Sequence, residues 1–292
     1  MQVKALACEL PRLSGVPLSR WSAEELAREV MQSGLVASIS GSTVWRWLDE
    51  DAIRPWYHRS WIFPRDPDFE AKATRVLDLY HGSWEGAPLC EGDFVLCADE
   101  KTSIQARRRK HSSTPPRSHR SMRVEHEYER LGAWAYLAAW DVQHAKLFGR
   151  CEVTTGIEPF DRLVADVMTQ PPYCEARRVF WIVDNASLHR GKRSILRLRR
   201  RYPKHPQLIL VHSPIHASWL NQIEIYFSIV QRKVLTPNDF TELSQVPERL
   251  LAFQNRYEAI AHPFKWEFTR DDLTNLMKKL DAPTQGPRSL AA

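Results

Sequence analysis

The chain has 292 residues, a modest excess of 41 Lys and Arg over 35 Asp and Glu, and an ordinary apolar content of 43%. This balance excludes wholesale disorder, and the lack of a signal-peptide pattern or of any run of about 18 apolar residues predicts neither export nor a membrane span. Five cysteines without a CxxC pair argue against a disulfide framework and a cysteine zinc site, and they predict a cytoplasmic protein.

Residues 1–55 are predicted to form a small helical unit. The segment SAEELAREVMQSG begins with Ser22 and carries Glu25 three residues later, which is the pattern of a helix capping box. After a turn at Gly41, the segment STVWRWLDED is predicted to be a second helix with Ser42 as its N-cap. The expected inward face of this helix comprises Val44, Trp47 and Leu48.

Two helices joined by a turn that contains glycine are the arrangement of a DNA-reading helix-turn-helix. In this interpretation the second helix contacts DNA through Ser42, Thr43 and Arg46. A plain helical hairpin fits the same spacing, and the pattern alone does not separate the two.

Residues 56–92 are predicted to be a connector rich in proline and aromatic residues, followed by one helix. Asp66 and Pro67 suit the N-cap and the first position of that helix. Linkers rarely carry large apolar side chains, so the connector is expected to pack against the protein through Trp56, Trp61 and Phe63.

Residues 93–280 change to strands alternating with helices. The predicted strands are DFVLCAD, AYLAAWDV, KLFGRCEVT, RVFWIVD and QLILVHSP. Helices are predicted at about 158–169, after Asp184, and from Ser218 to Val234. Hairpin-like strands followed by strand–helix alternation predict an α/β fold with a mixed sheet flanked by helices. Residues 281–292 are expected to be a disordered tail.

Two of the predicted strands end in an acidic residue, Asp99 and Asp184, and strand ends are where α/β folds bind ligands. A third acid, Glu224, lies on a helix that its apolar pattern predicts to be largely buried. An arginine partner would explain Glu224 as a structural residue; the alternative is that it faces the same cleft as the two strand-end acids. Asp141, at the end of another strand, is a rival acid for that cleft.

Three carboxylates without histidine or cysteine ligands suit Mg²⁺ or Mn²⁺ rather than zinc. Such sites hold two ions roughly 3.5 to 4 Å apart, which clamp the attacking and leaving oxygens of a phosphoryl transfer. Without metal the carboxylates repel one another, so at least one should have a raised pKa, and the buried pattern of its helix points to Glu224.

Basic runs follow each of the three acids, and they predict a groove for the backbone of double-stranded DNA. The residues assigned to it are Arg107, Arg108, Arg109, Lys110, Lys192, Arg193, Arg232 and Lys233.

Three blocks, CADEKTSIQ, WIVDNASLH and SWLNQIEIYFSIVQRKVL, occur in this order and together resemble those of DDE transposases of the mariner superfamily, in its bacterial insertion-sequence branch. The resemblance implies an RNase H-like catalytic domain at 93–280, with Asp99, Asp184 and Glu224 as a triad that binds Mg²⁺ or Mn²⁺. It also implies DNA cleavage and strand transfer at the ends of an insertion sequence, by a nucleoid-associated enzyme.

Asn185, His189 and Asn221 are candidate supporting residues beside this triad. For His189 a role in the site and a role as a turn cap both remain open. The look-alike family usually has two helix-turn-helix units before the catalytic domain. This chain has room for the second unit, so the first is expected to be missing.

The segment between Gln105 and Arg130 separates two strands that could pair directly, and Pro115-Pro116 interrupts any regular ladder through it. The resemblance implies that it reaches a partner subunit when a homodimer assembles on DNA; a surface loop is the alternative. Two other functions fit the same chain. One is a truncated, non-catalytic product that binds DNA or inhibits the full-length enzyme, and the other is a structure-directed nuclease of the same fold.

Overall fold

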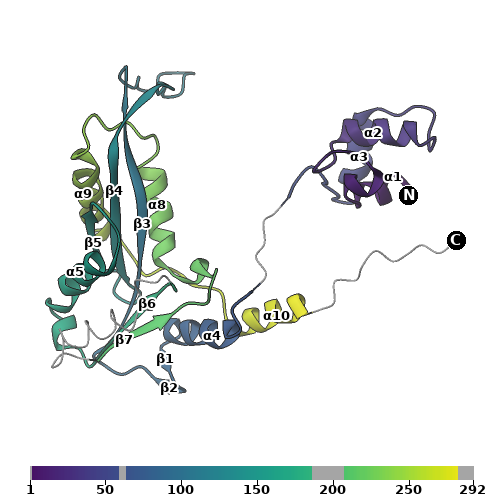
Figure 1. The fold of residues 1–292 in the computed structure, drawn as a ribbon. Helices are drawn as coiled ribbons and strands as arrows, with labels where there is room; N and C mark the ends of the chain where they lie inside the picture. Colours follow the sequence, from purple (N-terminus) through teal and green to yellow (C-terminus); the bar gives the residue numbers. More distant parts are fainter. Residues whose placement is uncertain (1, 59–63, 186–206, 282–292) are drawn as a thin grey trace. The chain divides into compact units, whose positions relative to one another are not determined.

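The protein is described here by a computed structural model that covers residues 2–58, 64–185 and 207–281 (Figure 1). The chain divides into two compact units, Met1–Ile62 and Phe63–Ala292. His189, Lys192, Arg193, the helix expected after Asp184, and nearly all of the expected tail lie outside the described residues. No helix in the described part has the length and apolar character needed to cross a membrane.

The first unit is helical, and its core is built from one face of each main helix. Its elements are α1 (Gln2–Ala7), the 3-10 helix η1 (Pro11–Ser14), α2 (Ala23–Gln32) and α3 (Gly41–Glu50). Leu26 and Val30 of α2 pack with Val44 and Leu48 of α3. Ser22 caps α2 as predicted, because its Oγ accepts the backbone N–H of Glu25 at 3.1 Å.

Two predictions for α3 are wrong. Its N-cap is Ser40, whose Oγ accepts the N–H of Thr43 at 3.2 Å, so Ser42 lies inside the first turn and is exposed. Trp47 is 39% exposed rather than inward-facing. The inward face of this short helix is only as wide as the row formed by Val44 and Leu48.

The second unit contains a five-stranded mixed sheet in the order β5-β4-β3-β6-β7. The strands are β3 (Asp93–Arg109), β4 (Tyr128–Asp141), β5 (Leu147–Glu152), β6 (Arg178–Val183) and β7 (Gln207–His212). The first three pair antiparallel, whereas β6 runs parallel to both β3 and β7. All five predicted strands are present. A two-stranded ribbon, β1 (Ser83–Trp84) with β2 (Ala87–Pro88), precedes them.

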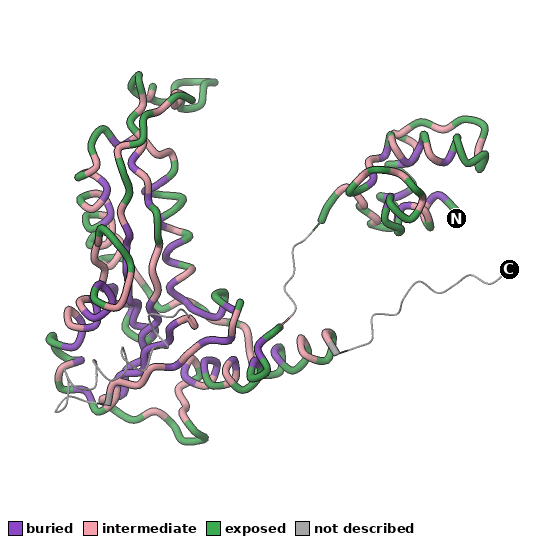
Figure 2. The backbone as a smooth tube through the Cα atoms, viewed as in Figure 1, coloured by how far each residue is buried: buried purple, intermediate pink, exposed green. Residues whose placement is uncertain are grey.

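Helices cover both faces of this sheet, as Figure 1 shows. One face packs against α5 (Ile157–Met168), with the 3-10 helix η2 (Tyr173–Glu175) beside it. The other packs against α4 (Phe69–Tyr80), α8 (Ile223–Lys233) and α9 (Gln245–Glu258), and α10 (Arg270–Asp281) lies against α4. The buried segments in Figure 2 follow the strands and the inner sides of these helices. The predicted α/β fold with a mixed sheet is therefore confirmed.

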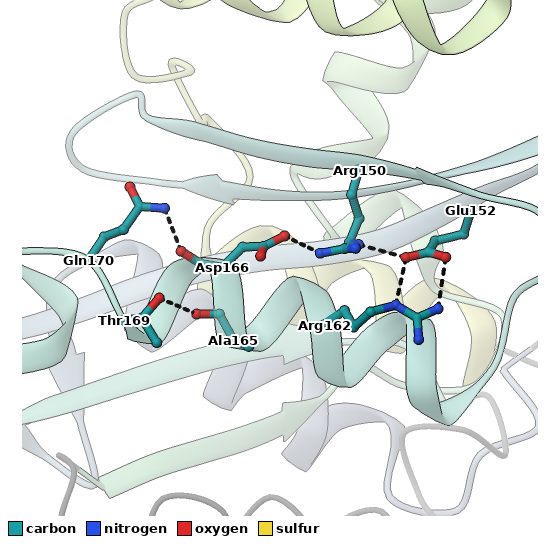
Figure 3. A network of polar contacts seen from close by, with 7 residues as sticks. All are labelled: Arg150, Glu152, Arg162, Ala165, Asp166, Thr169 and Gln170. Carbon is teal, nitrogen blue, oxygen red and sulfur yellow. Dashed lines mark hydrogen bonds and ion pairs between the residues drawn. The ribbon is translucent and has the colours of Figure 1, made fainter. Parts of the chain in front are cut away.

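A network of charged side chains ties α5 to the edge strand β5 (Figure 3). Glu152 accepts from Arg150 Nε at 2.7 Å and from Arg162 Nε and a terminal nitrogen at 2.9 and 2.8 Å. Arg150 also pairs with Asp166 of α5. Each arginine thus has a carboxylate partner, which identifies this cluster as a fixed link between helix and strand.

The structure corrects three predicted boundaries. The segment from Gln105 to Arg130 is not a structureless insertion, because β3 and β4 continue as a long hairpin arm whose ladder reaches the Arg109–Tyr128 pair. Ser218 does not cap the Glu224 helix; it begins the separate 3-10 helix η3 (Ser218–Leu220), and α8 starts at Ile223. α4 starts at Phe69, two residues later than an Asp66 cap implies.

Candidate active site

Asp99 and Asp184 lie level with each other on neighbouring strands. Cys97 of β3 pairs with Ile182 of β6, so two residues further along each strand the two aspartates are about one strand spacing apart, ~4.8 Å. Cys97 and Ile182 both belong to the core on the α8 side of the sheet. Because side chains alternate between faces along a strand, Asp99 and Asp184 also point to the α8 side.

The third acid is carried by the helix that covers this face. Glu224 lies in the first turn of α8 and is half-buried, and the α8 side chains Ile223, Phe227 and Val230 are buried in the core of the same face. Just before α8, the buried Asn221 donates from Nδ2 to the carbonyl of Ala98 at 3.0 Å. This bond holds the start of α8 against β3 at the residue that precedes Asp99.

Tyr80 of α4 also binds the segment that precedes α8. Its hydroxyl donates to the carbonyl of Leu220 at 2.6 Å and accepts the N–H of Gln222 at 3.3 Å, and it lies 3.1 Å from Sγ of Cys97. The ring of Trp266 packs on Tyr80 with centroids 5.1 Å apart. Neither aromatic residue stood out in the sequence, because the bonds of Tyr80 to Leu220 and Gln222 join residues 140 and 142 positions apart.

The end of β6 is held by contacts with β7. The ring Nδ1 of His212 donates to the carbonyl of Asp184 at 3.2 Å, and the side-chain amide of Asn185 donates to the carbonyl of Ser213. The N–H of Ser213 donates to the carbonyl of Val183 at 2.9 Å. Asn185 therefore supports the backbone that carries Asp184.

Burial raises the pKa of Asp99 to about 8, and the neighbouring Glu100, Asp184 and Glu224 add electrostatic repulsion. The other two acids predicted from sequence are therefore close enough to Asp99 for their charges to act on it. At least one of the three acids was expected to have a raised pKa, and Asp99, within the central strand of the sheet, has one.

The rival acid Asp141 is on the other face of the sheet. It pairs in register with Leu96, which packs on the α5 side. Its buried carboxylate accepts the N–H groups of Gln143 and His144 at 3.0 Å and the hydroxyl of Tyr173 at 2.7 Å. Asp141 therefore organises the turn between β4 and β5 and is separated from the three acids by the sheet.

The donor set at this place fits a hard cation. Asp99, Asp184 and Glu224 offer oxygen atoms alone, and the buried Oδ1 of Asn221 has no hydrogen-bond donor within the described residues. Within residues 2–58, 64–185 and 207–281, no three His, Cys, Asp or Glu side chains are gathered tightly enough to form a ready metal site.

The basic run after Asp99 lies far from the three acids. Arg107 is eight residues further along β3, about 27 Å at 3.4 Å per residue. On the hairpin arm, acidic residues face this run: Arg108 pairs with Glu129 and Lys110 with Glu127. Arg109 donates to the carbonyls of Asn238, Glu125 and His126, and Arg107 stacks over the Tyr128 ring at 4.6 Å. Much of this charge is used inside the arm.

Two predicted DNA contacts, Arg232 and Lys233, are exposed in the last turn of α8. A groove that also contains Glu224 is lined by Lys101 of β3 together with Arg232. Lys101 was not singled out from the sequence, although the two-residue period of a strand puts it on the same face as Asp99.

In the first unit, Ser42 and Arg46 are exposed on α3, and Thr43 is half-buried with its hydroxyl 2.9 Å from that of Ser40. The exposed Trp45 lies between them in sequence and lines a hollow with Trp56 and the first turn of α2.

A mixed sheet of this order and these helix positions define an RNase H-like α/β protein. A family model described as DDE superfamily endonuclease matches residues 94–246, slightly more than half of the chain. The chain therefore belongs to the DDE superfamily endonucleases.

Solved structures with the same fold include those of the Mos1 mariner transposase. The Mos1 paired-end complex with Mn has a TM-score of 0.53 at 12% identity, with 95% of this chain and 75% of that chain covered. The Mos1 strand transfer complex has a TM-score of 0.51 at 12% identity, covering 96% and 75% of the two chains. This likeness establishes the fold and confirms the predicted RNase H-like architecture. No curated protein sequence matches the chain.

Proposed function

We propose that this DDE endonuclease is a transposase of a bacterial insertion sequence, which cuts DNA at the element's ends and transfers the freed strand to a target. The observation that carries the proposal is the placement of Asp99 and Asp184, level on adjacent strands, on the sheet face covered by the helix of Glu224. The Mos1 complexes of similar fold include a paired-end complex and a strand transfer complex.

In this proposal Asp99, Asp184 and Glu224 hold Mg²⁺ or Mn²⁺, two ions in the fully loaded site. Such ions supply the positive charge that activates an attacking hydroxyl and stabilises the charge developing on the phosphate. Solved Mos1 complexes of similar fold were obtained with Mn and with Mg.

The chain's own residues position these carboxylates. Asn221 ties the start of α8 to β3, and Asn185 with His212 fixes the end of β6, so the three acids approach from rigid elements. Positioning of this kind supplies much of the rate in phosphoryl transfer, since the protein forms no covalent bond to the DNA. Burial and the acidic neighbours raise the pKa of Asp99, so a bound cation would favour the charged form of its carboxylate.

The remaining assignments follow from this function. Residues 1–55 bind the element's ends through Ser42, Thr43 and Arg46, residues 56–92 connect, and residues 93–280 catalyse. Arg107–Lys110, Lys192, Arg193, Arg232 and Lys233 contact the DNA backbone. The hairpin arm of β3 and β4 contacts a second subunit when two ends are paired. The protein acts in the bacterial cytoplasm at the nucleoid.

The test is a nicking assay with Mg²⁺ on duplex DNA that carries the terminal repeats flanking the gene. Asp184→Asn should abolish nicking by the folded protein. Glu100→Gln is the matched control, because Glu100 is also an acid of this region but its register partner Leu137 packs on the opposite sheet face. Nicking by Asp184→Asn at the wild-type rate would refute the assignment. Binding of the repeats without any nicking by the wild type would favour a non-catalytic, inhibitory product.

A further inference from the structure

A groove continues from Glu224 along the seam between β3 and α8. It has a volume of about 340 Å³ and is lined by Lys101, Glu224, Phe227, Ser228, Gln231 and Arg232. Its floor is apolar, since the Phe227 side chain is 4% exposed, whereas its rim is polar and cationic. The candidate catalytic acid Glu224 therefore lies at one end of the groove, and cationic and hydrogen-bonding groups line the remainder.

Lys101 occupies a defined place relative to Asp99. It pairs in register with Tyr136, whose ring is buried on the α8 side, so Lys101 and Asp99 share one face. Two residues along a strand correspond to about 6.8 Å. β3 bulges directly after Lys101, where Ser103 has a φ of 55°, and the strand then continues into the hairpin arm. Lys101 is thus the last residue of β3 before the bulge.

The ammonium of Lys101 has no polar partner in the part of the chain that the structure describes. None of the described residues forms an ion pair or hydrogen bond with it, although Glu224 lines the same groove. Lys101 differs in this respect from Arg108 and Lys110 of the arm, which face Glu129 and Glu127. A half-buried cation that the described fold leaves without an acidic partner suits an anionic ligand.

The α8 wall presents donors at helical spacing. Gln231 and Arg232 follow Ser228 by three and four residues, so both lie on its side of the helix. Arg232 Nε donates to the carbonyl of Ser228 at 3.2 Å, which orients the guanidinium along this side. Hydroxyl, amide and guanidinium groups of this kind are those that contact DNA phosphates.

We propose that this groove binds a phosphodiester of the DNA strand that is cut, one or two nucleotides from the cut bond, with Lys101 and Arg232 as its cationic contacts. The inference rests on the proposed DNA-cleaving function. The separation of Lys101 from Asp99, about 6.8 Å, is twice the 3.4 Å axial rise per nucleotide of a DNA strand. A strand whose scissile phosphate lies at Asp99 would therefore place a neighbouring phosphate beside Lys101.

The first test measures DNA binding without divalent metal, so that catalysis plays no part. Binding of a short fluorescent duplex with the terminal repeat is followed by anisotropy at increasing NaCl. Loss of one phosphate contact should reduce the slope of log K against log salt by about 0.9, for Lys101→Gln and for Arg232→Gln. Lys101→Arg should retain the wild-type slope. Lys265→Gln is the matched control, since Lys265 is 89% exposed and pairs with Glu267 outside the groove.

The second test identifies the phosphate. Duplexes that carry a single neutral methylphosphonate at successive positions near the cut bond are bound by the wild type and by Lys101→Gln. At the contacted phosphate, the loss of affinity caused by the neutral group in the wild type should be absent in Lys101→Gln, because the contact has already been removed. At other positions the fold-losses of affinity caused by the methylphosphonate and by Lys101→Gln should multiply.

Three results separate the possibilities. Folded Lys101→Gln could bind DNA more weakly with an unchanged salt slope, and Glu224→Gln could restore the affinity. This result would mean that Lys101 only neutralises Glu224, and it would overturn the inference. A wild type that binds the duplex but never cuts it would refute the proposed function, while the salt slopes would still decide the groove. A wild type that does not bind the duplex would overturn both.

Discussion

Two aspartates on opposite faces of the sheet, Asp141 buried and Asp99 half-buried, show how different the roles of one residue type are. Asp141 is fully buried and accepts hydrogen bonds from two backbone N–H groups and from Tyr173. Asp99 accepts the N–H of Glu100 at 2.8 Å but is surrounded by acids, and burial raises its pKa to about 8. The first carboxylate is satisfied by the fold, whereas the second is kept at a cost in folding free energy.

Substituting the two residues should therefore change stability in opposite directions. Asp99→Asn should raise the free energy of unfolding at pH 7 by about 1–2 kcal/mol, since a neutral amide removes both the burial cost and the repulsion. Asp141→Asn should lower it by about 1–3 kcal/mol, because an amide cannot accept all the hydrogen bonds that the carboxylate accepts. Urea unfolding in metal-free buffer measures both.

The exposed Glu242→Gln serves as the control for removing one negative charge. If Asp141→Asn stabilised the protein or Asp99→Asn destabilised it, the structural role of Asp141 and the functional role of Asp99 would be contradicted.

At the scale of elements, the position of Glu224 depends on how the start of α8 is held. Two side chains hold the start of α8 in place. The amide of Asn221 donates to the carbonyl of Ala98 in β3. The hydroxyl of Tyr80 donates to the carbonyl of Leu220 and lies beside Cys97 of β3. Trp266, from the segment between α9 and α10, closes over Tyr80. Segments distant in sequence therefore converge behind the candidate active site.

Tyr80→Phe should lower stability by about 1–2 kcal/mol, since the carbonyl of Leu220 and the N–H of Gln222 lose their partner. It should reduce the nicking rate by a larger factor than this loss explains, because Glu224 loses its fixed position. The measurement pairs urea unfolding with single-turnover nicking. Tyr257→Phe is the matched control: its hydroxyl makes no hydrogen bond with a described residue. Equal catalytic losses in both variants would assign Tyr80 a purely structural role.

The link between α5 and β5 predicts a dependence on acid. Hydrogen bonds from Arg162 and then Arg150 lower the pKa of Glu152 below 4.5, so the folded state binds its proton less readily than the unfolded chain. The stabilisation is complete above about pH 5 and is lost as the pH falls through 4.5 toward the lower folded pKa. The pKa of Asp93 is lowered by its hydrogen bond from Arg178, so Asp93 also contributes stability that is lost in acid.

Glu152→Gln isolates this contribution. The variant should be less stable than the wild type at pH 7, and the difference should shrink as the pH falls below 4.5, as measured by urea unfolding at a series of pH values. A difference that stayed constant down to pH 3 would contradict the assignment.

At the scale of the whole molecule, the two units have separate cores. The core of the first unit draws on α1, α2 and α3, and that of the second on the sheet and its helices. A fragment of residues 64–292 should therefore unfold cooperatively with a melting temperature within about 3 °C of the corresponding transition of the full chain. A fragment of residues 82–292 should fail to fold, because it lacks α4 with the fully buried Ala73, Val76 and Leu77. Calorimetry of the three proteins measures this, and a folded 82–292 fragment would contradict it.

Local patterns in the sequence determined much of this protein: five strands, the cap at Ser22, the apolar stripe of α8 and the acid that follows β6. The predicted strand end at Asp99 is wrong, because β3 continues to Arg109. These features depend on residues within one or two turns or along one strand, which a single sequence displays directly. The three ordered blocks added the RNase H-like fold that the comparisons confirm.

Only the tertiary structure decided which strand acids share a face, and the register of β3 against β6 and β4 excludes Asp141 from the side of Asp99. It also paired the basic run of the arm with Glu127 and Glu129 and left Lys101 beside Glu224. Strand register and helix docking are set by contacts between residues far apart in the chain, so a pattern of charges along the sequence does not reveal which charges meet.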